Sequence, residues 1–290
     1  MNLSLRARSA KQSLPPAPCA WRRLLRFARN DLVRHVGLAA LCFCGAAPQI
    51  SATEIPLDQR RSGYADLGRD TKAMEDDDTA NPATFGVLDG EALWNAKMGP
   101  ASKSCAYCHG DAAQSMKGVA ARYPAFDAKE GKPVDLEQRI NICRRDKQNA
   151  TPLEFESHDL LALTAYLARQ SRGLPIAEPS DPRLAPFIAQ GRALFEQRQG
   201  QINMSCAQCH DDNWGKKLAG NNVPQAHPTG YPIYRLEWQD LGSLQRRLRN
   251  CTIGMRAEPY GFGAPENVAL ELFLMWRARG MTVESPGVRP

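Results

Sequence analysis

The chain has 290 residues, of which 37 are Lys or Arg and 31 are Asp or Glu, and its formal net charge is +6. Eight of the basic residues and one acidic residue lie in the first 52 positions. Residues 53–290 therefore carry 29 basic and 30 acidic side chains, a net charge of about −1. The length allows two domains of ordinary size, and the charge balance excludes a nucleic-acid-binding protein, which needs a basic stripe.

Residues 1–52 have the layout of a secretory signal peptide. A basic lead is followed by an apolar run at 36–47 and by a small-residue exit at 50–52. The apolar run is too short to span a bilayer, which takes about 20 residues. We therefore expect cleavage near Ala52, a periplasmic protein, and no membrane span in the mature chain.

The rest of the chain is predicted to be helical and loop-rich. An extended lead is expected at 53–85, and a Pro-rich linker at 174–187. Asp135 and Ser157 have the side chains and positions of helix N-caps. No convincing alternating strand run appears, so the expected fold class is all-α. The predicted helices begin near Asp89 or Gly90 and then span 136–146, 157–171, 188–198, 240–250 and 266–279.

Two copies of one pattern follow each other along the chain. Residues 90–94 match residues 191–195 at an offset of 101. The pair Tyr123-Pro124 matches Tyr231-Pro232 at an offset of 108, and Cys143 matches Cys251 at the same offset. A repeat of this length indicates a duplicated domain. We place the first copy at 86–173 and the second at 188–290.

Each copy contains a Cys-x-x-Cys-His pentapeptide, at 105–109 and at 206–210. This motif is typical of covalent c-type haem attachment, in which both cysteines form thioethers and the histidine binds one axial face of the iron. Two tandem class I cytochrome c-like domains, each with one haem, are therefore predicted. The expected attachment residues are Cys105, Cys108, Cys206 and Cys209, with His109 and His210 as axial ligands.

Methionine and histidine are weak candidates for the sixth iron ligand. The sequence has no methionine between Met116 and Met204, and Met116 lies only seven residues after His109. Met255 fits the second haem on spacing alone. Packing roles are expected for Met98, Met204 and Met275. The histidines outside the motifs, His158 and His227, do not align between the copies.

Cys143 and Cys251 are the liganding residues that recur at matched positions, each at the end of an apolar helix face. A thiolate ligand lowers the reduction potential of a haem, and it is also a nucleophile suited to sulfur chemistry. Two alternatives are a small buried hydrophobic role for each cysteine and a Cys143–Cys251 disulfide.

Arg247 precedes Cys251 by one helical turn and has the chemistry to hold an oxyanion. Arg246 and Arg249 flank it. The alternatives for Arg247 are a surface position or a haem propionate partner. Arg139 precedes Cys143 at the same spacing, so spacing alone does not decide which haem is reactive.

A presequence, two haem motifs and a lone cysteine after each resemble the SoxA family of sulfur-oxidation cytochromes over residues 85–285. The segments 246–251 and 140–144 resemble that family's ligand segments. The resemblance implies two covalently bound haem c groups, with Cys143 and Cys251 as distal iron ligands. It also implies that Cys251 is a persulfide intermediate at the active second haem and that Arg247 binds the substrate.

The implied activity is that of an L-cysteine S-thiosulfotransferase. With the monohaem subunit SoxX, such a protein joins thiosulfate oxidatively to a cysteine of the carrier SoxYZ, and two electrons pass to a downstream cytochrome c. The alternative is a plain diheme electron-transfer protein, with a diheme peroxidase as a weaker third hypothesis. The methionine-free stretch and the paired lone cysteines favour the sulfur enzyme.

Overall fold

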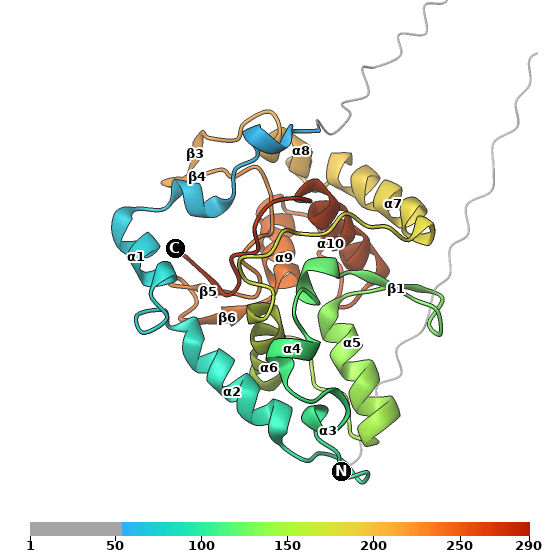
Figure 1. Ribbon diagram of the computed structural model, residues 1–290. Coiled ribbons are helices and arrows are strands. Elements are labelled where there is room, and N and C mark those ends of the chain that lie inside the picture. The colour runs from blue at the N-terminus through green and yellow to red at the C-terminus, as the bar shows by residue number, and fades with distance from the viewer. Residues whose placement is uncertain (1–53) are drawn as a thin grey trace, which may run out of the picture. The chain divides into compact units, whose positions relative to one another are not determined.

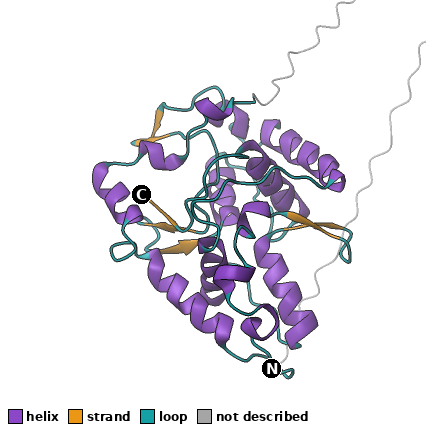
Figure 2. Ribbon diagram, in the orientation of Figure 1, coloured by secondary structure: helices purple, strands orange, loops and turns teal. Residues whose placement is uncertain are grey.

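Two stretches of the chain share an order of elements, namely a long helix, the short helix of the Cys-x-x-Cys-His motif, a strand hairpin and two further helices (Figures 1 and 2). The structure is a computed structural model that describes residues 54–290, so the predicted signal peptide lies outside the described residues. The first stretch contains α2 (Ala83–Asn95), α3 (Cys105–His109), α4 (Ala112–Ser115), β1 (Ala125–Asp127), β2 (Lys132–Val134), α5 (Leu136–Cys143) and α6 (His158–Arg169). The second contains α7 (Ala185–Glu196), α8 (Cys206–His210), β3 (Lys217–Leu218), β4 (Asn221–Asn222), β5 (Ile233–Arg235), β6 (Asp240–Gly242), α9 (Leu244–Gly254) and α10 (Pro265–Arg277). The short helix α4 has no counterpart in the second described stretch, and the hairpin of β3 and β4 has none in the first.

The first and last helices of each stretch pack closely because a glycine lies at the contact. A Cβ on Gly90 of α2 would overlap the carbonyl group of Ala162 in α6. A Cβ on Gly191 of α7 would overlap that of Ala269 in α10 in the same way. Glycine is therefore required at both places for the helix backbones to approach each other.

Each helix pair covers its own apolar core. In the first stretch, Trp94 of α2 packs with Ile140 of α5 and Leu163 of α6. In the second, Phe195 of α7 packs with Phe273 of α10, with ring centroids 5.4 Å apart. The aligned positions Trp94 and Phe195 thus have the same packing role in the two stretches.

The all-α expectation is met in the helices, but the described chain also has short strands. Strands β1 and β2 form an antiparallel hairpin, and so do β5 and β6, in the registers Ala125↔Val134 and Ile233↔Gly242. β7 (Gly287–Arg289) adds to the second hairpin in parallel with β5. Three-residue strands are too short to produce the alternation by which strands are recognised in a sequence.

The strand hairpins change one predicted helix boundary. Residues 240–242 pair as β6, and Ser243 caps α9 with its side chain accepting from the N–H of Arg246, so the helix expected at 240–250 begins at Leu244. Asp135 caps α5 as predicted, in a capping box with Gln138. Ser157 occupies the N-cap of α6, but its hydroxyl makes no capping hydrogen bond. The other helices lie where they were expected, with ends shifted by less than a turn; these are α5, α6, α7 and α10.

Residues 54–82 were expected to form an extended lead, but they contain helical elements. They contain 3-10 turns at Leu57–Gln59 and Gly63–Asp66 and the helix α1 (Arg69–Asp76). Glu75 in α1 is buried, accepts from the N–H of Val288 over 2.7 Å and pairs with Arg289. This segment is therefore anchored to the C-terminal strand β7. The first repeat helix correspondingly begins at Ala83, earlier than predicted.

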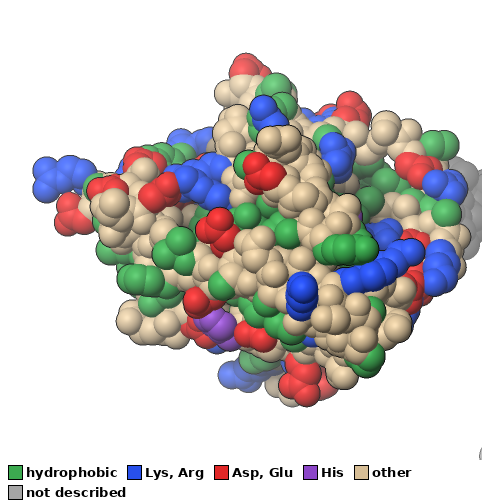
Figure 3. Space-filling view, turned by 60° about the horizontal axis from the view of Figure 1, so that its bottom comes forward, with side chains coloured by type: hydrophobic (Ala, Val, Ile, Leu, Met, Phe, Trp, Pro, Cys, Tyr) green, Lys and Arg blue, Asp and Glu red, His purple; other side chains and the backbone are tan. Residues whose placement is uncertain are grey.

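The remaining linking elements are short. They are 3-10 turns at Ala120–Arg122 and Pro182–Leu184 and a π-helical turn at Arg144–Gln148 after α5. Within residues 54–290, no helix combines the length and apolarity needed to cross a membrane. The face drawn in Figure 3 has basic and acidic side chains interspersed, in keeping with the near-balanced charge of this part of the chain.

Candidate functional site

The two Cys-x-x-Cys-His motifs form single helical turns with serine caps. Ser104 accepts from the N–H of Tyr107 over 3.0 Å at the start of α3. Ser205 and Gln208 form a capping box at the start of α8. These caps hold the cysteines and histidine of each motif on a rigid turn.

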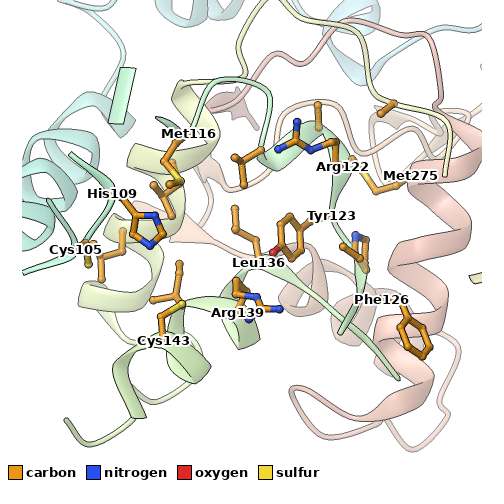
Figure 4. Close-up of a pocket in the computed structure, with 18 of the residues that line it drawn as sticks. Cys105, His109, Met116, Arg122, Tyr123, Phe126, Leu136, Arg139, Cys143 and Met275 are labelled. Carbon is orange, nitrogen blue, oxygen red and sulfur yellow. The ribbon is translucent and has the colours of Figure 1, made fainter. Parts of the chain in front are cut away.

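α3 and α5 face a large cavity in the first stretch (Figure 4). The cavity has a volume of about 540 Å³, in the range of small-molecule and cofactor sites. Cys105, Cys108 and His109 line one part of it, and Cys143 at the end of α5 lines another. Much of the remaining wall is apolar, including Trp94, Met116, Val119, Leu136, Ile140, Leu163 and Leu167. The residues present suit a haem joined to two cysteines and ligated by His109 and Cys143.

A second, smaller cavity of about 220 Å³ lies in the second stretch. His210, Arg247 and Cys251 line it together. Burial, and after it the proximity of Cys251 and Cys209, raise the pKa of the Cys206 thiol to about 12. The three cysteines of this stretch are therefore neighbours, and the donor set again suits a covalently attached haem.

His210 is held in the tautomer that binds metal through Nε2. Its Nδ1 donates a hydrogen bond to the carbonyl oxygen of Pro224 over 2.6 Å, which leaves Nε2 without a proton. Burial lowers the pKa of His210 to about 4, so the imidazole is neutral at physiological pH. A neutral, oriented imidazole is the form required of an iron ligand.

The methionines considered as iron ligands or packing residues differ in whether they line a cavity. Met255 is buried and does not belong to the residues lining the second cavity. Met116 lines the first cavity and lies beside His109 in Figure 4. Met275, expected to be a packing residue, reaches the first cavity from α10.

The two other histidines lie in different surroundings. His158 is exposed, and its Nε2 is 3.0 Å from Oδ2 of Asp89, away from both cavities. His227 lines the second cavity, although the comparison of the two copies in the sequence gave no reason to place it there. Its Nδ1 donates to the carbonyl oxygen of Arg61 over 2.8 Å, and its buried Nε2 has no hydrogen-bond partner among the described residues.

The disulfide alternative is wrong, because the six cysteines of the described chain are unpaired. Cys143 and Cys251 line different cavities. Each is partly buried beside its own haem motif. The repeat therefore distributes one lone cysteine to each site.

Arg139 and Arg247, which hold equivalent positions in the repeat, differ in their partners. Arg139 forms an ion pair with Asp127. Arg247 lines the second cavity and makes no side-chain hydrogen bond or ion pair with any residue in 54–290.

The arginines that flank Arg247 point to other partners. Arg246 lies over the ring of Trp238 at 4.2 Å, with Glu156 3.9 Å away. Arg249 donates to the carbonyl oxygen of Tyr260. Neither of them lines the second cavity. Within α9, Arg247 is thus the arginine available to a ligand there.

Three cavity residues were missed from the sequence: Tyr231, Arg235 and Arg289. Tyr231 is partly buried, and desolvation raises its pKa to about 12, so the phenol is protonated at neutral pH. The signal that identifies Arg235 was present in the sequence, because it lies 108 residues after Asp127, the offset that relates Cys143 to Cys251.

Comparisons with known proteins agree with this arrangement. A family model described as the SoxA/TsdA cytochrome c domain matches residues 89–176 and 190–283. A protein of Pseudaminobacter salicylatoxidans named L-cysteine S-thiosulfotransferase subunit SoxA is 39% identical over 81% of this chain and 82% of its own. The protein of the same name from Paracoccus pantotrophus is 33% identical over 79% of this chain and 78% of its own. The crystal structure of SoxXA from P. pantotrophus matches with a TM-score of 0.77, covering 80% of this chain and 87% of that chain. These matches support a cytochrome c-like fold with covalently bound haem c.

Proposed function

This chain belongs to the SoxA/TsdA cytochrome c family, and we propose that it is the SoxA-type subunit of an L-cysteine S-thiosulfotransferase. One observation carries the proposal most directly. His210, Cys251 and Arg247 line one cavity, and the Arg247 side chain has no hydrogen-bond or ion-pair partner among residues 54–290. This set combines an iron ligand, a sulfur nucleophile and an anion-binding group, which is the combination that thiosulfate chemistry requires.

Two haem c groups are proposed, one in each cavity. Cys105 and Cys108 would form the thioethers of the first, with His109 and Cys143 as axial ligands. Cys206 and Cys209 would hold the second, with His210 and Cys251 as axial ligands. When bound, the haems supply an electron acceptor at each site. The repeated order of elements and the two separate family matches support two cytochrome c-like, mainly helical units at 86–173 and 188–290, joined by the segment 174–187.

The proposed reaction forms a sulfur–sulfur bond with loss of two electrons. The thiol of the carrier and the thiosulfate dianion give a carrier–S–S–SO3 monoanion, one proton and two electrons. The S–H bond breaks, and the carrier sulfur bonds to the outer sulfur of thiosulfate. Arg247 would hold the sulfonate end by charge-assisted hydrogen bonds, and Cys251 would act as the persulfide intermediate.

The second cavity is proposed as the reactive one because Arg139 and Arg247, the equivalent arginines of the two copies, differ in their partners. Asp127 pairs with Arg139 beside the first cavity, whereas Arg247 forms no ion pair with any described residue and lines the second cavity. A guanidinium already paired with a buried carboxylate has little attraction left for a further anion. We therefore assign the first haem an electron-transfer or structural role.

A periplasmic location and three protein partners complete the proposal. The predicted signal peptide at 1–52 supports export to the periplasm. The similarity to one chain of the SoxXA structure supports a monohaem SoxX partner. The reaction needs a thiol to conjugate and an oxidant to receive electrons, and the resemblance to the SoxA family implies SoxYZ as the carrier and a downstream cytochrome c as the electron acceptor.

Electron paramagnetic resonance of the oxidised, periplasm-expressed protein tests the ligand assignment, with mass spectrometry of the same sample. Low-spin signals typical of thiolate–histidine ligation, with the mass of two haems, support the sulfur enzyme. Histidine–methionine signals would leave Cys143 and Cys251 free and return the chain to the plain diheme electron carriers. Bis-histidine signals at one haem would instead identify His227 as a ligand, since its Nε2 is available in the second cavity.

A further inference from the structure

Asp127 and Arg235 occupy the same place in the two repeated hairpins. Asp127 is the third residue of β1 and pairs in register with Lys132. Arg235 is the third residue of β5 and pairs in register with Asp240. Asp127 and Arg235 are 108 residues apart in the sequence, and so are Lys132 and Asp240. The same offset separates Arg139 from Arg247. The duplicated site therefore carries an acid in one copy and a base in the other, next to the same arginine.

In the first copy, this position neutralises the arginine. The Asp127 carboxylate is buried and forms an ion pair with Arg139. Hydrogen bonds from the N–H groups of Glu130 and Lys129, and after them the Arg139 guanidinium, lower the pKa of Asp127. The carboxylate is thus ionised at neutral pH and holds Arg139 in a closed pair.

In the second copy, Arg235 adds a positive charge instead. Arg235 and Arg247 line the same cavity as Cys251. Arg235 is only 9% exposed, and its buried Nε has no hydrogen-bond partner among the described residues. Its Nη2 bonds to Glu237 over 2.8 Å, but the Glu237 side chain is 63% exposed, so water weakens that pair.

The third arginine of the cavity is fully engaged. Arg289 pairs with Glu75 through Nη1 and with Glu284 through Nη2, the latter over 2.8 Å. Asp66, the acidic side chain that lines this cavity, pairs with Arg61 at 3.3 Å. The positive charge available to a ligand therefore comes from Arg235 and Arg247.

We propose that Arg235 is a second substrate-binding residue, which together with Arg247 holds the dianion beside Cys251. The inference rests on the proposed function and extends it. Two guanidinium groups side by side in a buried cavity repel each other until an anion lies between them. In agreement with this repulsion, the pKa of Arg235 is lowered first by burial and next by the charge of Arg247. The planar forks of the two arginines provide separate donors for the oxygen atoms of a sulfonate group.

Steady-state conjugation of thiosulfate to the carrier by the assembled, haem-loaded complex is the first test. Arg235→Gln is expected to raise the KM for thiosulfate by about ten- to a hundredfold, the range for loss of one charge-assisted hydrogen bond, with a smaller change in kcat. Arg235→Asp reproduces the acidic residue of the first site. It should raise the KM for thiosulfate further, because the new carboxylate would pair with Arg247. Arg246→Gln is the matched control, since Arg246 is next to Arg247 but contacts Trp238 outside the cavity.

Glu237→Gln provides a second variant, at an exposed position where a substitution is expected to change stability little. Removing this competing carboxylate frees Arg235, so the KM for thiosulfate should fall by about twofold, as expected for a solvent-exposed ion pair. A KM that is unchanged in Arg235→Gln, or that rises in Glu237→Gln, overturns the proposal.

Sulfate, an unreactive dianion, gives a readout that does not depend on turnover. Sulfate should inhibit wild-type conjugation competitively, and calorimetric titration should show its binding weakened in Arg235→Gln and strengthened in Glu237→Gln. An unchanged sulfate affinity, with a shifted reduction potential, would assign Arg235 to a haem propionate and reject a substrate role. A wild-type complex that conjugates no thiosulfate would refute the proposed function. In that case loss of sulfate binding in Arg235→Gln would still support the anion site.

Discussion

Gln245 donates a hydrogen bond from Nε2 to Oδ2 of Asp135 over 2.8 Å, joining the first turn of α9 to the N-cap of α5. Both side chains are buried. The Oε1 atom of Gln245 accepts from the N–H of Gly263 over 2.7 Å, and Gln138 donates to the carbonyl oxygen of Gly263 over 3.0 Å. Because α5 ends at Cys143 and α9 contains Cys251, this network fixes the two cysteine-bearing helices relative to each other.

Replacing Gln245 with Leu should therefore destabilise the described fold. The change leaves a buried carboxylate oxygen of Asp135 without a partner, at a cost of about 1–3 kcal/mol, and also removes the acceptor of the partly buried N–H of Gly263. Urea unfolding of the haem-loaded protein measures the loss. Gln114→Leu serves as the control, because Gln114 is exposed on α4 and should shift stability by no more than about 0.5 kcal/mol. Equal midpoints for the two variants would contradict a structural role for this network.

Buried carboxyl groups near this network predict an unusual pH dependence. Burial raises the pKa of Asp135 to about 6. Burial, followed by the charge of Asp135, also raises the pKa values of Glu137 and Glu271. Glu156 is nearby and faces Arg246 at 3.9 Å. One oxygen of Glu137 has no hydrogen-bond partner among the described residues, so no donor compensates its charge.

A carboxyl group whose pKa is higher in the folded than in the unfolded protein makes folding less favourable as the pH rises. Its penalty is absent below the unfolded value, about 4 for Glu, and grows as the pH rises toward the folded value. Glu137→Gln should thus resemble the wild type at pH 4 and become progressively more stable than it toward pH 7. Thermal unfolding across this range measures the difference. Glu258→Gln, at an exposed position, is the matched control. A constant difference between wild type and Glu137→Gln at every pH would show that Glu137 does not titrate in this way.

Sequence reasoning identified what repeats and missed what differs between the copies. The offsets of 101 and 108 aligned the haem motifs and the lone cysteines, because covalent attachment demands fixed residue types at fixed spacing. The β5–β6 hairpin was missed because each strand has three residues, and α1 was missed because Glu75 reads as solvated acid until Arg289 is placed beside it. His227 was set aside for lack of a counterpart, although the second cavity does not need to match the first.

Charge reversal at Asp127 and Arg235 shows where sequence alone stops. Both residues were visible at the repeat offset, yet neither has a meaning until the partner of Arg139 is known. The ion pair of Asp127 with Arg139 depends on the β1–β2 hairpin, which brings the end of β1 next to α5. The two residues are twelve positions apart in the sequence. Long-range geometry of this kind is not encoded in local periodicity.

The close contact of α7 with α10 gives a third prediction. Gly191→Ala should destabilise the protein by about 1–3 kcal/mol, because the added Cβ overlaps the backbone of Ala269 and the helices must separate. Gly254→Ala is the matched control at the end of α9, where a Cβ meets no atom within 4 Å. That change should be neutral or stabilising by up to about 1 kcal/mol through helix propensity. Denaturant midpoints of the two variants decide the matter, and a stable Gly191→Ala variant would contradict the close packing.

The fourth prediction separates the roles of the two lone cysteines. Cys251→Ser should abolish thiosulfate conjugation, because a serine hydroxyl does not carry sulfur as a persulfide and is a poor ligand for iron. Both haems should stay attached, since their thioethers involve Cys105, Cys108, Cys206 and Cys209. Mass spectrometry verifies the haem count, and turnover with the carrier measures the activity.

Cys143→Ser is the matched change in the first cavity. It should remove the thiolate signal of one haem from the paramagnetic resonance spectrum, while conjugation persists at a measurable rate. The reason lies in the surroundings of each sulfur: Arg139 beside Cys143 is occupied by Asp127, whereas Cys251 shares its cavity with two arginines that are not neutralised by a buried acid. Normal turnover in Cys251→Ser, or complete loss in Cys143→Ser alone, would reverse the assignment of the reactive site.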